Sequence, residues 1–86
     1  MDLNSVLSGV KSKEIEPVYK KLGENVRSMR EQKGMSVQEV AERYGKSVST
    51  VTELERGNVR VLVSDVEKIA TILGVAPKVL MAGAWF

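Results

Sequence analysis

The sequence predicts an all-α fold in one small domain, and three observations support this. The chain has 86 residues, a length typical of a single domain. Its apolar residues recur three and four positions apart along most of the chain, which is the spacing of one helical face. Serines and prolines stand where these apolar sets begin, and glycines stand where they end. We therefore expect a compact five-helix domain over residues 17–81, with short extensions at both ends.

The N-terminal extension, residues 1–16, contains one apolar set. Leu3, Val6, Leu7 and Val10 have the spacing of one helical face, which is compatible with a short helix there. Polar residues interrupt this set, so it does not resemble the hydrophobic region of a signal peptide.

Residues 17–33 predict the first and longest helix of the domain. Pro17 suits a first helical turn, where its missing N–H is not needed. Gly34 fits the left-handed position just past a helix C-terminus. The apolar stripe between them consists of Val18, Leu22, Val26 and Met29.

Two short helices follow, joined by a tight turn. Ser36 and Glu39 form a Ser-x-x-Glu capping box ahead of a helix that ends at Gly45. Ser47 caps the next helix, which ends at Gly57. Two such helices around a short turn make a helix-turn-helix motif.

The last part of the domain predicts a loop and two more helices. Residues 58–62 are interpreted as a loop that turns partly inward. Ser64 and Glu67 have the spacing of a second capping box, and the helix behind them ends at Gly74. Pro77 opens a short final helix. The apolar face of the longer helix is Val63, Val66, Ile69, Ala70 and Leu73.

The composition excludes several classes of function. The chain has no cysteine and no histidine, so we expect no disulfide, no metal site, no cofactor and no enzymatic activity. No apolar run approaches the ~20 residues of a membrane span, so we expect a soluble cytoplasmic protein without a membrane partner. With 13 basic and 11 acidic residues, the net charge of +2 is too small to indicate nucleic acid by itself.

Residues 18–81 resemble the lambda-repressor-like regulators, also called the Xre or Cro/CI family. The motifs that carry the resemblance are Ala41, Gly45, the Ser-Val-Ser-Thr at 47–50, the Glu-Arg-Gly at 55–57 and the Leu-Gly-Val at 73–75. The resemblance implies a sequence-specific regulator of transcription that binds double-stranded DNA. It favours a repressor that binds paired half-sites as a homodimer, with helix 47–56 in the major groove.

The resemblance also places the residues that face the bases. These are Lys46, Val48, Ser49 and Glu53, and the periodicity adds Thr52 to the same outer face. Many family members have glutamine, which reads adenine, where this chain has Val48. Valine offers only apolar contact, such as with a thymine methyl group, and Glu53 can accept from cytosine N4–H. We therefore expect sparse direct readout, supported by DNA shape.

Contacts to phosphates must then supply most of the affinity. The candidates are polar and basic side chains around the two helix starts and just past the second helix, together with the backbone N–H groups at the start of the second helix. These side chains belong to Ser36, Gln38, Lys46, Ser47, Thr50, Arg56, Asn58 and Arg60. Ser36 and Ser47 are explained equally well as helix caps.

Two further sets are expected to be structural. The family pattern implies an inner ion pair between Arg30 and Glu55 that ties two helices together rather than reading DNA. The apolar tail, residues 82–86, ends in Trp85 and Phe86. These two aromatics either fold back on their own domain or form a dimer contact with Leu3 and Leu7 of the N-terminal extension, and we favour the dimer.

Two alternatives to a dedicated regulator remain open. The protein could be the antitoxin of a toxin–antitoxin pair. Its protein partner, a toxin or an anti-repressor, would then bind through either end of the chain. It could also be a protein–protein interaction module that uses this fold without binding DNA. The excess of acidic over basic residues in 35–57, and Val48 in place of a polar reader, motivate the second alternative.

Overall fold

The computed structural model describes residues 16–84, and this part of the chain folds into five helices without a β-strand. The helices are α2 (Glu16–Gln32), α3 (Val37–Tyr44), α4 (Val48–Glu55), α5 (Val63–Leu73) and α6 (Pro77–Met81). The all-α, five-helix prediction is therefore confirmed. The short helix that is compatible with residues 2–10 lies outside the described residues. None of the five helices is long and apolar enough to cross a membrane.

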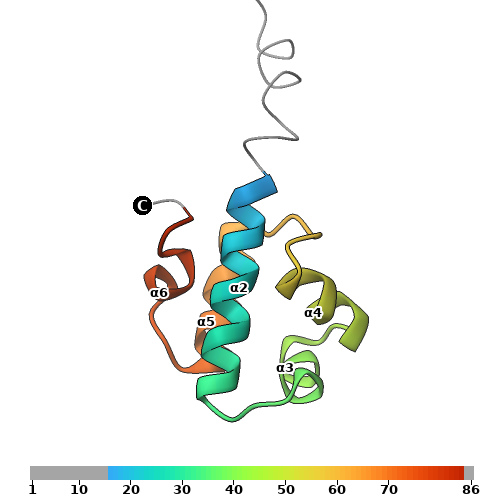
Figure 1. Ribbon diagram of the computed structural model, residues 1–86. Coiled ribbons are helices and arrows are strands. Elements are labelled where there is room, and N and C mark those ends of the chain that lie inside the picture. Colours follow the sequence, from blue (N-terminus) through green and yellow to red (C-terminus); the bar gives the residue numbers. More distant parts are fainter. Residues whose placement is uncertain (1–15, 85–86) are drawn as a thin grey trace, which may run out of the picture.

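The long helix α2 runs through the middle of the domain, and the other helices surround it (Figure 1). It packs against α4 on one side, against α6 on the other, and against α5 behind it. The remaining helix, α3, packs against both α4 and α5. The helix-turn-helix unit, α3 and α4, thus forms one side of the molecule.

The core contains apolar side chains from all five helices and one from the loop before α5. The buried residues are Leu22, Val26, Val40, Ala41, Tyr44, Val51, Leu54, Val61, Val66, Ile69, Ala70, Leu73 and Leu80. The prediction for Val63 is wrong, because this side chain is 63% exposed. Val63 is the first residue of α5, and Val61 from the preceding loop is buried instead.

The start of α5 also differs from the prediction. The helix begins at Val63, so Ser64 lies inside its first turn and does not cap it. The N-terminal contact is made by Asp65, whose Oδ2 accepts from the Leu62 N–H at 3.3 Å. Its Oδ1 accepts from the Tyr44 hydroxyl at 3.0 Å, which ties α5 to α3. Asp65 therefore contacts both α3 and the N-terminal end of α5.

Two glycines allow α2 to approach the end of α4 closely. Gly23 is buried, and a Cβ atom there would lie 2.6 Å from the carbonyl oxygen of Glu55. Gly57 has a φ of 82°, and a Cβ atom there would lie 2.5 Å from the Cα atom of Lys20. Real Cβ contacts are longer than this, so the last turn of α4 touches the backbone of α2 directly.

Asn25 attaches the C-terminal part of the domain to α2. Its Nδ2 donates to the carbonyl oxygens of Leu80 and Ala82, each at 2.8 Å. These carbonyls belong to the end of α6, where helix carbonyls lack intrahelical partners. A side chain of α2 therefore completes the end of α6.

Candidate nucleic-acid interface

Local hydrogen bonds define both ends of α3, the helix that leads into the turn before α4. Ser36 Oγ accepts from the Glu39 N–H at 3.0 Å, and the Glu39 carboxylate accepts from the Ser36 N–H at 3.2 Å. At the other end, Gly45 has a φ of 76°, and its N–H donates to the Ala41 carbonyl at 2.9 Å. The predicted capping box and glycine stop are both present. Because they fix the two ends of α3, they also fix the direction in which the chain enters α4.

The first turn of α4 is capped by Ser47. Its Oγ accepts from the Thr50 N–H at 3.1 Å and lies 2.9 Å from the Thr50 hydroxyl. The first N–H that bonds to a backbone carbonyl inside the helix is that of Val51, which donates to the Ser47 carbonyl at 3.2 Å. Helix starts of this kind leave the preceding N–H groups without intrahelical partners, directed out of the N-terminal end of the helix, which applies here to those of Val48 and Ser49.

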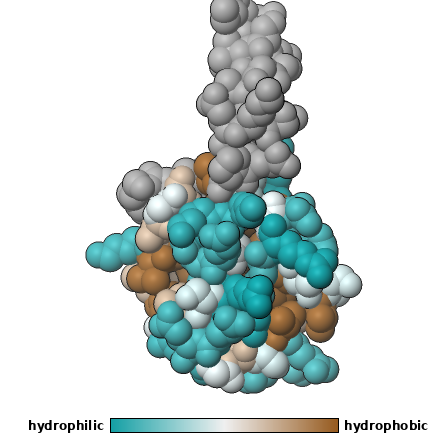
Figure 2. Space-filling view, in the orientation of Figure 1, coloured by the Kyte–Doolittle hydropathy of each residue, from teal (hydrophilic) through white to brown (hydrophobic). Residues whose placement is uncertain are grey.

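The two faces of α4 differ in polarity and size. Val51 and Leu54 are buried against the core. On the opposite face Ser49 is exposed, Val48 is 46% exposed, and Thr52 is half-buried. The space-filling view is mainly hydrophilic but has hydrophobic areas near α6 and around α3 and α4 (Figure 2). The outer face of α4 therefore presents short side chains of mixed polarity.

None of the side chains expected to contact DNA is buried. Half-buried are Thr50, Thr52 and Glu53, and exposed are Ser36, Gln38, Lys46, Ser47, Val48, Ser49, Arg56, Asn58 and Arg60. The Lys46 ammonium lies 5.9 Å from the centre of the Tyr44 ring, within reach of a cation–π interaction. Burial and the hydrogen bond to Asp65 raise the pKa of Tyr44 to about 12, so its ring remains neutral beside Lys46.

Three of these side chains form one cluster at the C-terminal end of α4. The two carboxylate oxygens of Glu53 accept from Arg56 Nη1 at 3.1 Å and from Asn58 Nδ2 at 2.8 Å. The hydrogen bond from Asn58 lowers the pKa of the Glu53 carboxyl. The sequence assigns these residues to separate contacts with bases and phosphates. Their spacing of three and five positions across a helix end is the signal that could have indicated the cluster.

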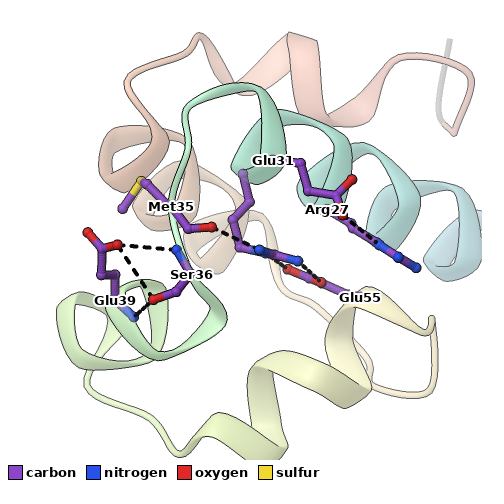
Figure 3. A network of polar contacts seen from close by, with 7 residues as sticks. Arg27, Glu31, Met35, Ser36, Glu39 and Glu55 are labelled. Atoms are coloured by element: carbon purple, nitrogen blue, oxygen red, sulfur yellow. Dashed lines mark hydrogen bonds and ion pairs between the residues drawn. The ribbon is translucent and has the colours of Figure 1, made fainter.

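Arg30 of α2 and Glu55 of α4 form a nearly buried ion pair (Figure 3). The guanidinium donates to the two carboxylate oxygens of Glu55 at 2.6 and 3.1 Å, and also to the Met35 carbonyl at 2.9 Å. The side chains are only 12% and 8% exposed. The hydrogen bond with Glu55 raises the pKa of Arg30. The pair lies on the inner side of α4, away from its exposed outer face.

The residues expected at a dimer contact, Trp85, Phe86, Leu3 and Leu7, lie outside the described residues. The described surface has another apolar feature that the sequence does not indicate. Leu62 and Val63 are 68% and 63% exposed at the start of α5. Within residues 16–84, no group of three acidic, histidine or cysteine side chains is arranged to hold a metal ion.

Residues 21–82 match the model of the family described as helix-turn-helix domain, and the chain belongs to this family. The prediction from the sequence motifs is therefore confirmed. A comparison with curated proteins found no match.

Among solved structures, the chain is similar to the restriction-modification controller protein C.AhdI from Aeromonas hydrophila, with 31% identity and a TM-score of 0.73 over 78% of this chain and 97% of that one. It is also similar to the clp gene regulator ClgR from C. glutamicum, with 32% identity and a TM-score of 0.72 over 80% and 92% of the two chains. A hypothetical transcription factor, NHTF from Neisseria, is 34% identical with a TM-score of 0.70 over 74% of each chain. The three are described as a controller protein, a gene regulator and a hypothetical transcription factor. The fold of this chain is thus that of DNA-binding, lambda-repressor-like transcription regulators.

Proposed function

We propose that this protein is a sequence-specific regulator of transcription, and specifically a repressor, that binds double-stranded DNA as a homodimer with α4 in the major groove. The observation that carries this proposal is the construction of α4. Its inner side is held by a nearly buried ion pair and by backbone contact with α2, while its outer side is exposed and small. A helix that is held in place on its inner side and carries short side chains on its exposed face is suited to enter a groove.

The dimensions of α4 support this placement. Its eight residues span about 12 Å, and the major groove is about 12 Å wide. Ser49 can exchange hydrogen bonds with base edges, and Val48 can contact a thymine methyl group. The outward N–H groups at the start of α4, with the exposed Lys46 beside them, fit phosphate oxygens. Arg60, exposed in the loop before α5, offers a second cationic contact.

The small number of cations supports the proposal of a homodimer. Each phosphate contact contributes to affinity and to its salt dependence, and a net charge of +2 leaves one copy with few such contacts. Two copies on adjacent half-sites, with their α4 helices about 34 Å apart, would add their contacts on one duplex. We propose the terminal apolar residues Trp85, Phe86, Leu3 and Leu7 as the dimer contact.

Selection from a pool of random duplexes, followed by sequencing, tests the whole proposal. We expect one palindromic motif whose half-sites are centred about 10 base pairs apart, and two protein copies per selected duplex by native mass spectrometry. A reporter gene with this motif inside its promoter should lose expression when the protein is present. Recovery of duplexes without a common motif would refute sequence-specific binding and would favour a protein-binding module on this fold.

Point variants test the proposed orientation of α4. Lys46→Ala should weaken binding to all duplexes alike and reduce the salt slope by about one. Ser49→Ala should instead change the preferred base at one position of the motif. Lys68→Ala, which removes an exposed cation from α5, is the matched control and should do neither. If Lys46→Ala and Ser49→Ala both bind as the wild type does, α4 does not face the DNA in this way.

A further inference from the structure

The cluster of Glu53, Arg56 and Asn58 combines groups with opposite effects on DNA binding, and its role as inferred here rests on the proposed DNA-binding function. Arg56 and Asn58 are donors suited to phosphate oxygens, whereas a carboxylate repels phosphate. In the structure each oxygen of Glu53 is occupied by one of these donors, at 3.1 Å from Arg56 Nη1 and 2.8 Å from Asn58 Nδ2. The carboxylate therefore occupies the same donors that a phosphate would use.

The position of Glu53 separates it from the other acid of α4. Glu55 is 8% exposed and bound to Arg30, so its charge is compensated inside the domain. The side chains of Glu53 and Arg56 are 41% and 66% exposed, on the part of the molecule that we place against DNA. The negative charge of Glu53 thus reduces the electrostatic contribution of Arg56 before any DNA is bound.

We propose that Glu53 is an intramolecular counter-anion that competes with phosphate for Arg56 and Asn58, and that it yields these donors when a base of the cognate site occupies its carboxylate. Each carboxylate oxygen can accept more than one hydrogen bond. A cytosine N4–H in the major groove can therefore join or replace the internal donors. Guanine and thymine offer only acceptors or a methyl group in the major groove, so Arg56 stays paired with Glu53 on a duplex that presents one of these bases at this place.

The exposure of the cluster makes this exchange feasible. Ion pairs between exposed side chains are weak because water competes with both partners. A single base-edge donor together with a nearby phosphate can therefore displace the internal contacts without a large cost. In this arrangement Glu53 is a specificity-determining residue, because it lowers the affinity for wrong duplexes more than the affinity for the correct one.

Glu53→Gln removes the charge and nearly preserves the shape. We expect this variant to bind a scrambled duplex about two- to fivefold more tightly than the wild type does, with a salt slope steeper by about 0.9 because Arg56 gains one phosphate contact. Affinity for the selected motif should not rise, so the ratio of cognate to non-cognate affinity falls. Glu53→Ala, which cannot pair with adenine as glutamine can, should show the same steeper slope.

Two controls identify the mechanism. Glu67→Gln removes an exposed acid from α5, which lies behind α2 (Figure 1), and therefore makes the same change in net charge. It should leave the slope for the scrambled duplex unchanged. In a protein that already carries Arg56→Gln, the further change of Glu53→Gln should give no additional steepening, because the cation that it would release is missing.

The contact can also be measured without DNA. In the wild type, NMR resonances of the Asn58 side-chain amide should move together with the titration of the Glu53 carboxyl, and in Glu53→Gln they should not respond to pH in that range. A wild-type amide that ignores this titration would overturn the proposal. If the wild type selects a motif but Glu53→Gln binds like Glu67→Gln, only the role of Glu53 fails. If the wild type selects no motif, the proposed function itself fails.

Discussion

Replacing Arg30 with methionine should lower the free energy of unfolding by about 3–5 kcal/mol, the range found when one partner of a buried ion pair is removed. Methionine retains apolar volume but has no donors. The Glu55 carboxylate, only 8% exposed, would lose both of its short guanidinium contacts, and the Met35 carbonyl would lose a third. Water reaches such a carboxylate poorly, so most of its lost solvation would not be recovered.

This loss is large relative to the stability of a domain of this size. At roughly 0.05–0.15 kcal/mol per residue, such a domain has a total of about 4–13 kcal/mol. A loss of this magnitude should also lower the melting temperature by more than about 10 °C. The expected effect is thus far outside the error of standard unfolding measurements.

Urea unfolding followed by circular dichroism at 222 nm measures the effect. Arg27→Met is the matched control, since Arg27 pairs with Glu31 on the same helix but both side chains are more than half exposed, at 64% and 56%. It should cost less than about 1 kcal/mol. The double variant Arg30→Met/Glu55→Leu should cost much less than the sum of its single changes, because it strands no charge.

If Arg30→Met costs no more than Arg27→Met, burial of the ion pair does not determine its contribution, and the reasoning is refuted. A structural role also predicts that folded Arg30→Met binds DNA within about twofold of the wild type. A change in the preferred motif would instead show that Arg30 reads DNA.

Three further outcomes are expected from other contacts. Gly23→Ala should lower the free energy of unfolding by about 2 kcal/mol in the same urea assay, because the new Cβ would press against backbone carbonyls of α4. This cost should exceed the gain from the better helix propensity of alanine. An unchanged urea midpoint would contradict the close approach of α2 and α4. Ser47→Ala should cost about 1 kcal/mol and Ser47→Gly only a few tenths, as for a helix cap, and equal losses would argue against capping. Absorbance at 295 nm should show Tyr44 ionising near pH 12 in the folded protein. Because the pKa of Tyr44 is raised above the ordinary value of about 10, its contribution to stability is present below pH 10 and is lost as the pH rises toward 12. Tyr44→Phe should lack this loss of stability. An absorbance midpoint near pH 10 would contradict the raised pKa.

Most of the fold can be predicted from the sequence because its signals are local. The Ser36–Glu39 box, the Ser47 cap and the stop at Gly45 each act within a few residues, and each is found where the sequence indicates. The start of α5 could not be predicted in this way. There the contact comes from Asp65, which is also held by Tyr44 from another helix, and such a non-local partner leaves no periodic pattern.

In the candidate site, too, local features could be predicted from the sequence and contacts between side chains could not. Helical periodicity predicts that Val51 and Leu54 face inward and that Val48 and Ser49 face outward. The spacing of Glu53, Arg56 and Asn58 is compatible with their pairing, but periodicity alone does not predict which polar side chains bond to one another. The hydrogen bonds of Asn25 to carbonyls 55 and 57 positions away were also hidden, because only the packing of α6 on α2 creates them.

The close approach of α2 to the end of α4 has a consequence for how such a protein can diversify. Gly23 and Gly57 bring backbone against backbone there, so the placement of α4 depends little on the side chains of its outer face. Those outer positions can then be exchanged without disturbing the support beneath them. A new binding preference could arise by substitution at a few exposed positions, and the same separation makes this domain a suitable scaffold for grafting other recognition helices.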